Sequence, residues 1–147
     1  MLKRKKTPEG NSQEKNVVEP IIYLAENAPK ETQEITSELI SMRGIIKLLI
    51  IKLSGQVIYS YERWGKSEKS LNETDVLELI NNVQNQLKKI GKKSIDHTII
   101  RSEDSNIVIF SVENIITFLQ SDKKAKLPLV TIKTKRIADS IASLVNE

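Results

Sequence analysis

The longest apolar run of the chain, residues 44–62 (GIIKLLIIKLSGQVIYSYE), most constrains what it can fold into. Ser54-Gly55 in its middle is typical of a two-residue hairpin turn, because glycine readily takes the positive φ that such a turn requires. The stretch before the turn is apolar on both faces and predicts a central strand, whereas the stretch after it alternates and predicts an edge strand. The register that pairs apolar residues places Ile51 opposite Ile58, Ile50 opposite Tyr59 and Leu48 opposite Tyr61.

Composition narrows the class of protein. A chain of 147 residues that is 39% hydrophobic and 29% charged is expected to form one soluble domain. It has no cysteine and a single histidine, so we expect no disulfide, no thiol catalysis and no metal or other cofactor, in a reducing, cytoplasmic setting. No acid, base and nucleophile can be brought together from the sequence, so we expect no enzyme. Abundant Ile and Lys with little Ala and Gly are typical of an AT-rich, archaeal-like genome.

Residues 1–16 form a polar segment that we expect to be a disordered basic tail. They hold five basic and two acidic residues, in a chain whose net charge is +4. Because most of the excess charge lies in this tail, we expect no nucleic-acid binding by the folded part. The tail either keeps the protein soluble or contacts a membrane surface or another polyanion. The residues for such a contact are Lys3, Arg4, Lys5 and Lys6.

Residues 17–30 are expected to form an apolar arm or linker. Pro20 interrupts the apolar residues Val17 to Ala25 and argues against a central strand. The arm is expected either on the surface of its own domain or docked on a partner. A helix is predicted to open at Asn27, with Pro29 in its first turn, and to be closed by Gly44.

The longest predicted helix runs from a cap at Asn72 or Thr74 to Gly91. Its apolar residues recur at helical spacing, so one face is expected to be buried. The remaining positions are rich in neutral amides, which indicate either a helix-to-helix contact or an ordinary solvated face. The apolar stripe is Val76, Ile80, Val83, Leu87 and Ile90, and the amides are Asn81, Asn82, Gln84, Asn85 and Gln86.

Three strands and a helix are predicted for the rest of the chain. Residues 95–101 alternate and predict an edge strand, and residues 107–112 and 115–120 predict a second hairpin. The β-branched stretch 129–134 fits a strand by propensity, but Pro128 and the helical spacing of the apolar residues that follow favour a helix. We therefore predict a last helix over 129–145.

This order of helix, hairpin, long helix, three strands and helix resembles the roadblock family, which includes dynein light chains and GTPase-associated modules and is related to longin domains. The residues that carry the resemblance are IIKLLIIKLSGQVIYSY, the long helix ending in KKIG, the strand pair IVIFSVENIITFLQSD and KAKLPLVTIKTKRIADSIASLV. The resemblance implies an α+β fold, an α/β/α sandwich around a five-stranded antiparallel sheet, over residues 31–147. A longin domain would begin with the hairpin, so the helix before Gly44 favours a roadblock domain.

The resemblance also implies a symmetric dimer in which the long helices and the edges of the third strand meet. The pair is expected to be a homodimer or a heterodimer with a paralogue. The implied function is a non-catalytic scaffold or regulator that binds a Ras-like small GTPase or a related assembly. The alternatives are an adaptor that binds membranes or polyanions through its tail, and a longin- or profilin-like protein-binding module. The interface residues implied are Ile80, Asn81, Val83, Gln84, Asn85, Leu87, Lys88, Asp96, Thr98 and Ile100.

Overall fold

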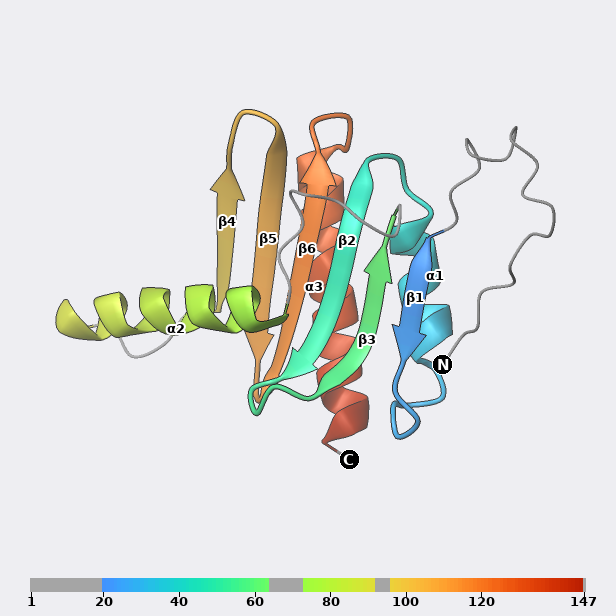
Figure 1. Ribbon diagram of the computed structural model, residues 1–147, viewed down its shortest axis with the longest axis horizontal. Helices are drawn as coiled ribbons and strands as arrows, with labels where there is room; N and C mark the ends of the chain where they lie inside the picture. Colours follow the sequence, from blue (N-terminus) through green and yellow to red (C-terminus); the bar gives the residue numbers. More distant parts are fainter. Residues whose placement is uncertain (1–19, 64–72, 92–95, 147) are drawn as a thin grey trace, which may run out of the picture.

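The computed structural model describes residues 20–63, 73–91 and 96–146. Its strands form one antiparallel sheet of six strands in the order β1-β3-β2-β6-β5-β4. Helices α1 and α3 cover one face of the sheet, and α2 crosses the other face at a steep angle to the strands (Figure 1). The α+β sandwich is therefore confirmed. The elements are β1 Ile21–Leu24, α1 Thr32–Ile40, β2 Ile45–Lys52, β3 Val57–Glu62, α2 Glu73–Lys89, β4 His97–Arg101, β5 Ser105–Val112, β6 Ile115–Asp122 and α3 Leu127–Val145.

Strand β2 lies in the middle of the sheet and contributes to the core on both of its faces. Its residues Leu48 and Ile50 pack in the larger cluster, beneath α1 and α3. Leu49 and Ile51 pack in the smaller cluster, beneath α2. Because successive side chains of a strand point to opposite faces, an apolar run on both faces needs a layer on each side, as the sequence predicted for this strand.

The sheet has one strand more than expected. Residues 21–24 form β1, which pairs antiparallel with β3, with Ile22 opposite Tyr61 and Leu24 opposite Tyr59. The prediction that the second strand of the hairpin forms an edge is therefore wrong, because β1 covers it. Pro20 lies just outside β1, where its missing N–H costs the ladder nothing, so it excludes a central position but permits an edge strand.

The hairpin turn and the start of the first helix also differ from the prediction. Ile50 pairs with Tyr59 and Leu48 with Tyr61, as predicted, but Ile51 faces Val57 across a bulge. Lys52 N–H donates to the Gln56 carbonyl at 2.9 Å, so the loop is longer than Ser54-Gly55 and shifts the register. Helix α1 begins at Thr32 and not at Asn27, because two turns, closed by Ala28 N–H to Ala25 O and by Thr32 N–H to Pro29 O (both 3.1 Å), first reverse the chain.

Helix α3 confirms that residues 129–145 are helical despite their β-branched start. Pro128 lies in the first turn, where its fixed φ suits a helix and its missing N–H has no helical partner to lose. The hydroxyls of Thr131 and Thr134 donate to the carbonyls of Leu127 and Val130 at 2.8 and 2.7 Å, so the helix satisfies both polar groups. Burial of Ile137 and Ile141 against the sheet then outweighs the strand propensity. Among the described residues, no helix has the length and apolar character needed to cross a membrane.

Candidate functional site

One edge of the sheet, formed by β4, carries backbone groups that point away from β5, the only strand beside it in the described part of the chain. Ser111 N–H donates to the Asp96 carbonyl at 2.9 Å, and Ser102 N–H donates to the Ser105 carbonyl at 3.0 Å. Hydrogen-bonded pairs alternate along an antiparallel ladder, so the residues between these pairs direct their N–H and C=O groups outward. These residues are His97, Ile99 and Arg101, and on their outer side, away from β5, no described strand lies next to them. The edge is therefore open to another strand.

Helix α2 extends past this open edge. Its first half is seated on the sheet, because Val76 and Ile80 are buried against Ile109 and Phe118. Farther along, Val83 and Gln84 lie over the edge itself and line a narrow pocket together with residues of β4 and β5. Beyond them the helix runs out past β4 (Figure 1). The end of α2 therefore has none of the described strands beneath it.

The structure brings most of the predicted interface residues to this corner, but in different roles. Ile80 belongs to the core beneath α2. Gln84 and Val83 are half-buried beside Asp96 and Thr98. Thr98 and Ile100 pair with Ile109 and Ile107, so they lie on the α2 face of β4. Asn81, Asn85, Lys88 and Asp96 are exposed. The side chain of Leu87 and residues Lys3, Arg4, Lys5 and Lys6 lie outside what the structure describes.

Solved structures of other proteins have the same arrangement of helices and strands. A structure of MglB in a tetrameric arrangement superposes with a TM-score of 0.69 at 21% identity, over 86% of this chain and 96% of that one. The gliding protein MglB from Thermus thermophilus gives 0.68 at 20% identity, over 86% and 97%. A Roadblock/LC7 domain from Streptomyces avermitilis gives 0.61 at 9% identity, over 78% and 98%.

The chain has the roadblock fold. No protein-family model and no curated protein sequence matches it, so the likeness rests on the structures. The resemblance drawn from the sequence is thus confirmed for the fold. Within this roadblock fold, the described residues contain no group of three or more His, Cys, Asp or Glu side chains placed to hold a metal ion.

Two exposed apolar residues at the corner of this roadblock fold were not among the predicted interface residues. Ile90, just after α2, is 67% exposed, although its spacing placed it in the buried stripe. Ile99 of β4 is 41% exposed and lies on the α3 face, beside His97, whose ring stacks on Phe110 at 5.2 Å. The alternation of residues 95–101 already put Ile99 and His97 on one side, but sequence alone could not show that Ile99 would stay exposed.

Proposed function

We propose that this chain is a non-catalytic, dimeric platform that binds a Ras-like small GTPase or a related protein assembly. The dimer forms when β4 of one copy pairs with β4 of a second copy, or of a paralogue, while the two α2 helices pack on each other. The observation that carries the proposal is the open edge of β4 beneath the overhanging end of α2. An unpaired edge without charged or proline protection at its centre invites a further strand.

The length of the overhang fits this dimer. Residues 85–89 follow Gln84 in α2, and at 1.5 Å per residue they extend about 7.5 Å beyond the edge. Neighbouring strands are about 4.8 Å apart, so the overhang would span about two strands of a second sheet. Pairing would cover the exposed side chains of Ile90 and Ile99 and the outward backbone groups of β4.

The chemistry of the α2 surface also supports pairing. Asn81, Gln84 and Asn85 are neutral, so two copies of this surface meet without like-charge repulsion. Amide groups exchange hydrogen bonds with one another at a smaller desolvation cost than charged groups. MglB, which shares the fold, has been observed in a tetrameric arrangement, so association of several copies has a precedent in this fold.

A charge-reversal experiment tests the dimer. Gln84→Glu combined with Asn85→Glu places four carboxylates at the two-fold interface, and we expect the mass measured by light scattering to halve while circular dichroism stays unchanged. The matched control is Asn82→Glu with Gln86→Glu, which adds the same charge on exposed positions that helical spacing puts on the side of α2 opposite the buried Ile80. A variant at 84 and 85 that keeps the wild-type mass would contradict the proposal.

The partner is tested with purified Ras-like GTPases from the source organism, each loaded with GDP or with a GTP analogue. We expect one of them to bind the wild-type protein in calorimetry, with a preference for one nucleotide state, and to bind the 84/85 variant at least about tenfold more weakly, because the platform requires the dimer. Unchanged binding by the 84/85 variant would separate partner recognition from dimerisation. Absence of binding to every such GTPase would refute the partner class.

A further inference from the structure

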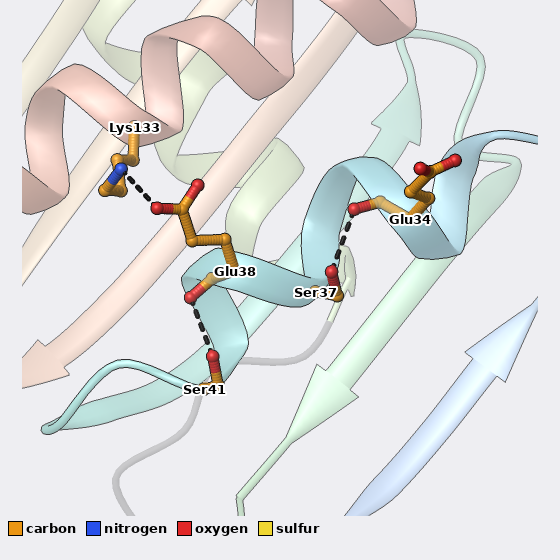
Figure 2. A network of polar contacts seen from close by, with 5 residues as sticks. All are labelled: Glu34, Ser37, Glu38, Ser41 and Lys133. Carbon is orange, nitrogen blue, oxygen red and sulfur yellow. Dashed lines mark hydrogen bonds and ion pairs between the residues drawn. The ribbon is translucent and has the colours of Figure 1, made fainter.

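The face of the sheet opposite α2 presents a second candidate surface, formed by α1 and α3. The two helices run antiparallel on this face (Figure 1). Lys133 of α3 pairs with Glu38 of α1 at 2.7 Å between Nζ and Oε2 (Figure 2). Between the helices lies a groove of about 200 Å³, lined by Ile35 and Glu38 on one side and by Lys133 and Arg136 on the other.

The two walls of this groove carry opposite charges. The exposed acids of α1 and its cap are Glu31, Glu34 and Glu38. The hydroxyls of Ser37 and Ser41 donate to the main-chain carbonyls of Glu34 and Glu38 at 2.9 and 3.0 Å, so neither hydroxyl pairs with a carboxylate (Figure 2). The exposed side of α1 is therefore an acidic ridge, of which Glu38 lines the groove itself.

The α3 wall is basic and partly apolar. Lys133, whose hydrogen bond and charge lower the pKa of Glu38, is one cation of this wall. Arg136 is the other; its side chain is exposed, and its charge also lowers the pKa of Glu38. One turn before them, Leu129 and Ile132 are 43% and 54% exposed, although α3 is otherwise well packed on its inner side.

The charges on the two walls lie at matching heights. Glu34 is four residues before Glu38 on α1, a displacement of about 6 Å, and Arg136 is three residues after Lys133 on α3, a displacement of about 4.5 Å. Because the helices are antiparallel, both steps go in the same direction from the Glu38–Lys133 pair. An acid therefore stands level with a base at two successive turns.

We infer that this α1–α3 face binds a second copy of the chain about a two-fold axis that runs along the groove. Such an axis places the acidic ridge of each copy on the basic ridge of the other. Rotation about it leaves the position of every residue along the helix axes unchanged. Glu38 and Glu34 of one copy then meet Lys133 and Arg136 of the other, and each pair occurs twice, as an isologous interface requires. The association also removes Leu129 and Ile132 from water. Because the face carries both an acidic and a basic ridge, it fits a second copy of itself better than a partner surface that is only acidic or only basic.

Together with the proposed β4–α2 dimer, on which the tetramer rests, this second interface assembles four copies. Arg136→Glu in the full chain puts two like-charge contacts into each α1–α3 interface, and we expect a mass of four copies to fall to two in sedimentation at low salt, with dissociation at least about tenfold more favourable. High salt should produce the same shift in the wild type, because the pairs remain near solvent.

The decisive variant restores the interface by exchanging the charges. Glu34→Arg alone should dissociate it, and Glu34→Arg with Arg136→Glu should recover the wild-type mass. The matched control is Lys135→Glu, an equal change on α3 at a side chain that pairs with Asp139 at 3.0 Å instead of facing the groove; it should leave the mass unchanged. A wild-type mass in the Arg136→Glu variant, or no recovery in the exchanged variant, would overturn the inference.

The measured masses separate this inference from the proposed function. If the β4–α2 dimer does not form but the α1–α3 face does associate, the wild type has a mass of two copies that Arg136→Glu reduces to one and the 84/85 variant leaves unchanged. If the α1–α3 face does not associate, the wild type has two copies that only the 84/85 variant reduces to one.

Discussion

The two edge strands of the sheet, β1 and β4, differ in length, in a neighbouring proline and in the helix that lies over them. At one edge, the four residues of β1 follow Pro20 and pair with β3, and the hydrogen bond from Ala25 N–H to Ile58 O at 3.0 Å holds the end of the strand. At the other edge, the five residues of β4 contain no proline and lie beneath a helix that continues past them. A short edge next to a proline is poorly suited to further pairing, whereas β4 keeps its outer groups available.

We therefore expect the two edges of the sheet to have different roles, one in stability and the other in association. At the β1 end, which we call the closed end, Ile22 and Leu24 pack against the larger core cluster of the same chain. Changes there should alter the free energy of unfolding and leave association alone. Changes on the outer side of β4 should alter association and leave the free energy of unfolding of the single subunit nearly constant.

The largest expected effect lies at the closed end. Tyr59 is buried in β3 between Leu24 and Ile50, so Tyr59→Ala removes a large side chain from the core. We expect the free energy of unfolding to fall by about 3–5 kcal/mol in urea denaturation. The control Tyr59→Phe keeps the ring and should lose much less. A loss in Tyr59→Ala no larger than in Tyr59→Phe would show that this end does not hold the core together.

A smaller effect, and a sharper contrast, comes from proline substitutions at adjacent residues of β4. Ile100 pairs with Ile107 and directs its N–H into the sheet, so Ile100→Pro should lower the free energy of unfolding by about 1–3 kcal/mol. Ile99 directs its N–H outward, so Ile99→Pro should leave subunit stability nearly unchanged, abolish the β4 pairing and halve the mass measured by light scattering. Equal loss of stability in the two variants would mean that the outer groups of β4 are not free.

The smallest effect concerns pH. Burial raises the pKa values of Tyr59 and Tyr61, both at the closed end. A raised pKa in the folded state means that this contribution to stability is complete below the unfolded value of about 10 and is lost as pH rises through the folded pKa values. We expect the denaturation midpoint to decline only above that pH, in step with tyrosinate absorbance, and Tyr61→Phe to flatten the decline. The same decline in Tyr61→Phe and Tyr59→Phe would assign it to other groups.

The sequence predicted the features that depend on residues close together in the chain, namely the helices, the strands and their order. The alternation of apolar residues in α2 and the double-sided run of β2 gave the right elements, and their order gave the α+β sandwich and the resemblance to roadblock domains. The spacing also favoured a helix over 129–145 against its strand propensity. Each of these patterns belongs to contiguous residues, because helix and strand periods are set by local backbone geometry.

Tertiary structure decided what depends on residues far apart. Nothing local could tell that Ile22 and Leu24 would pair with β3, that α2 would extend past β4, or that Lys133 would pair with Glu38 on a neighbouring helix. The sequence named α2 and β4 as the candidate interface, and that assignment remains a prediction. It included Ile80, which the structure buries beneath α2, and did not include Ile99 and Ile90, which the structure exposes. The reason is physical, since exposure of a side chain is fixed by which distant element packs over it, and periodicity alone carries no information about that packing.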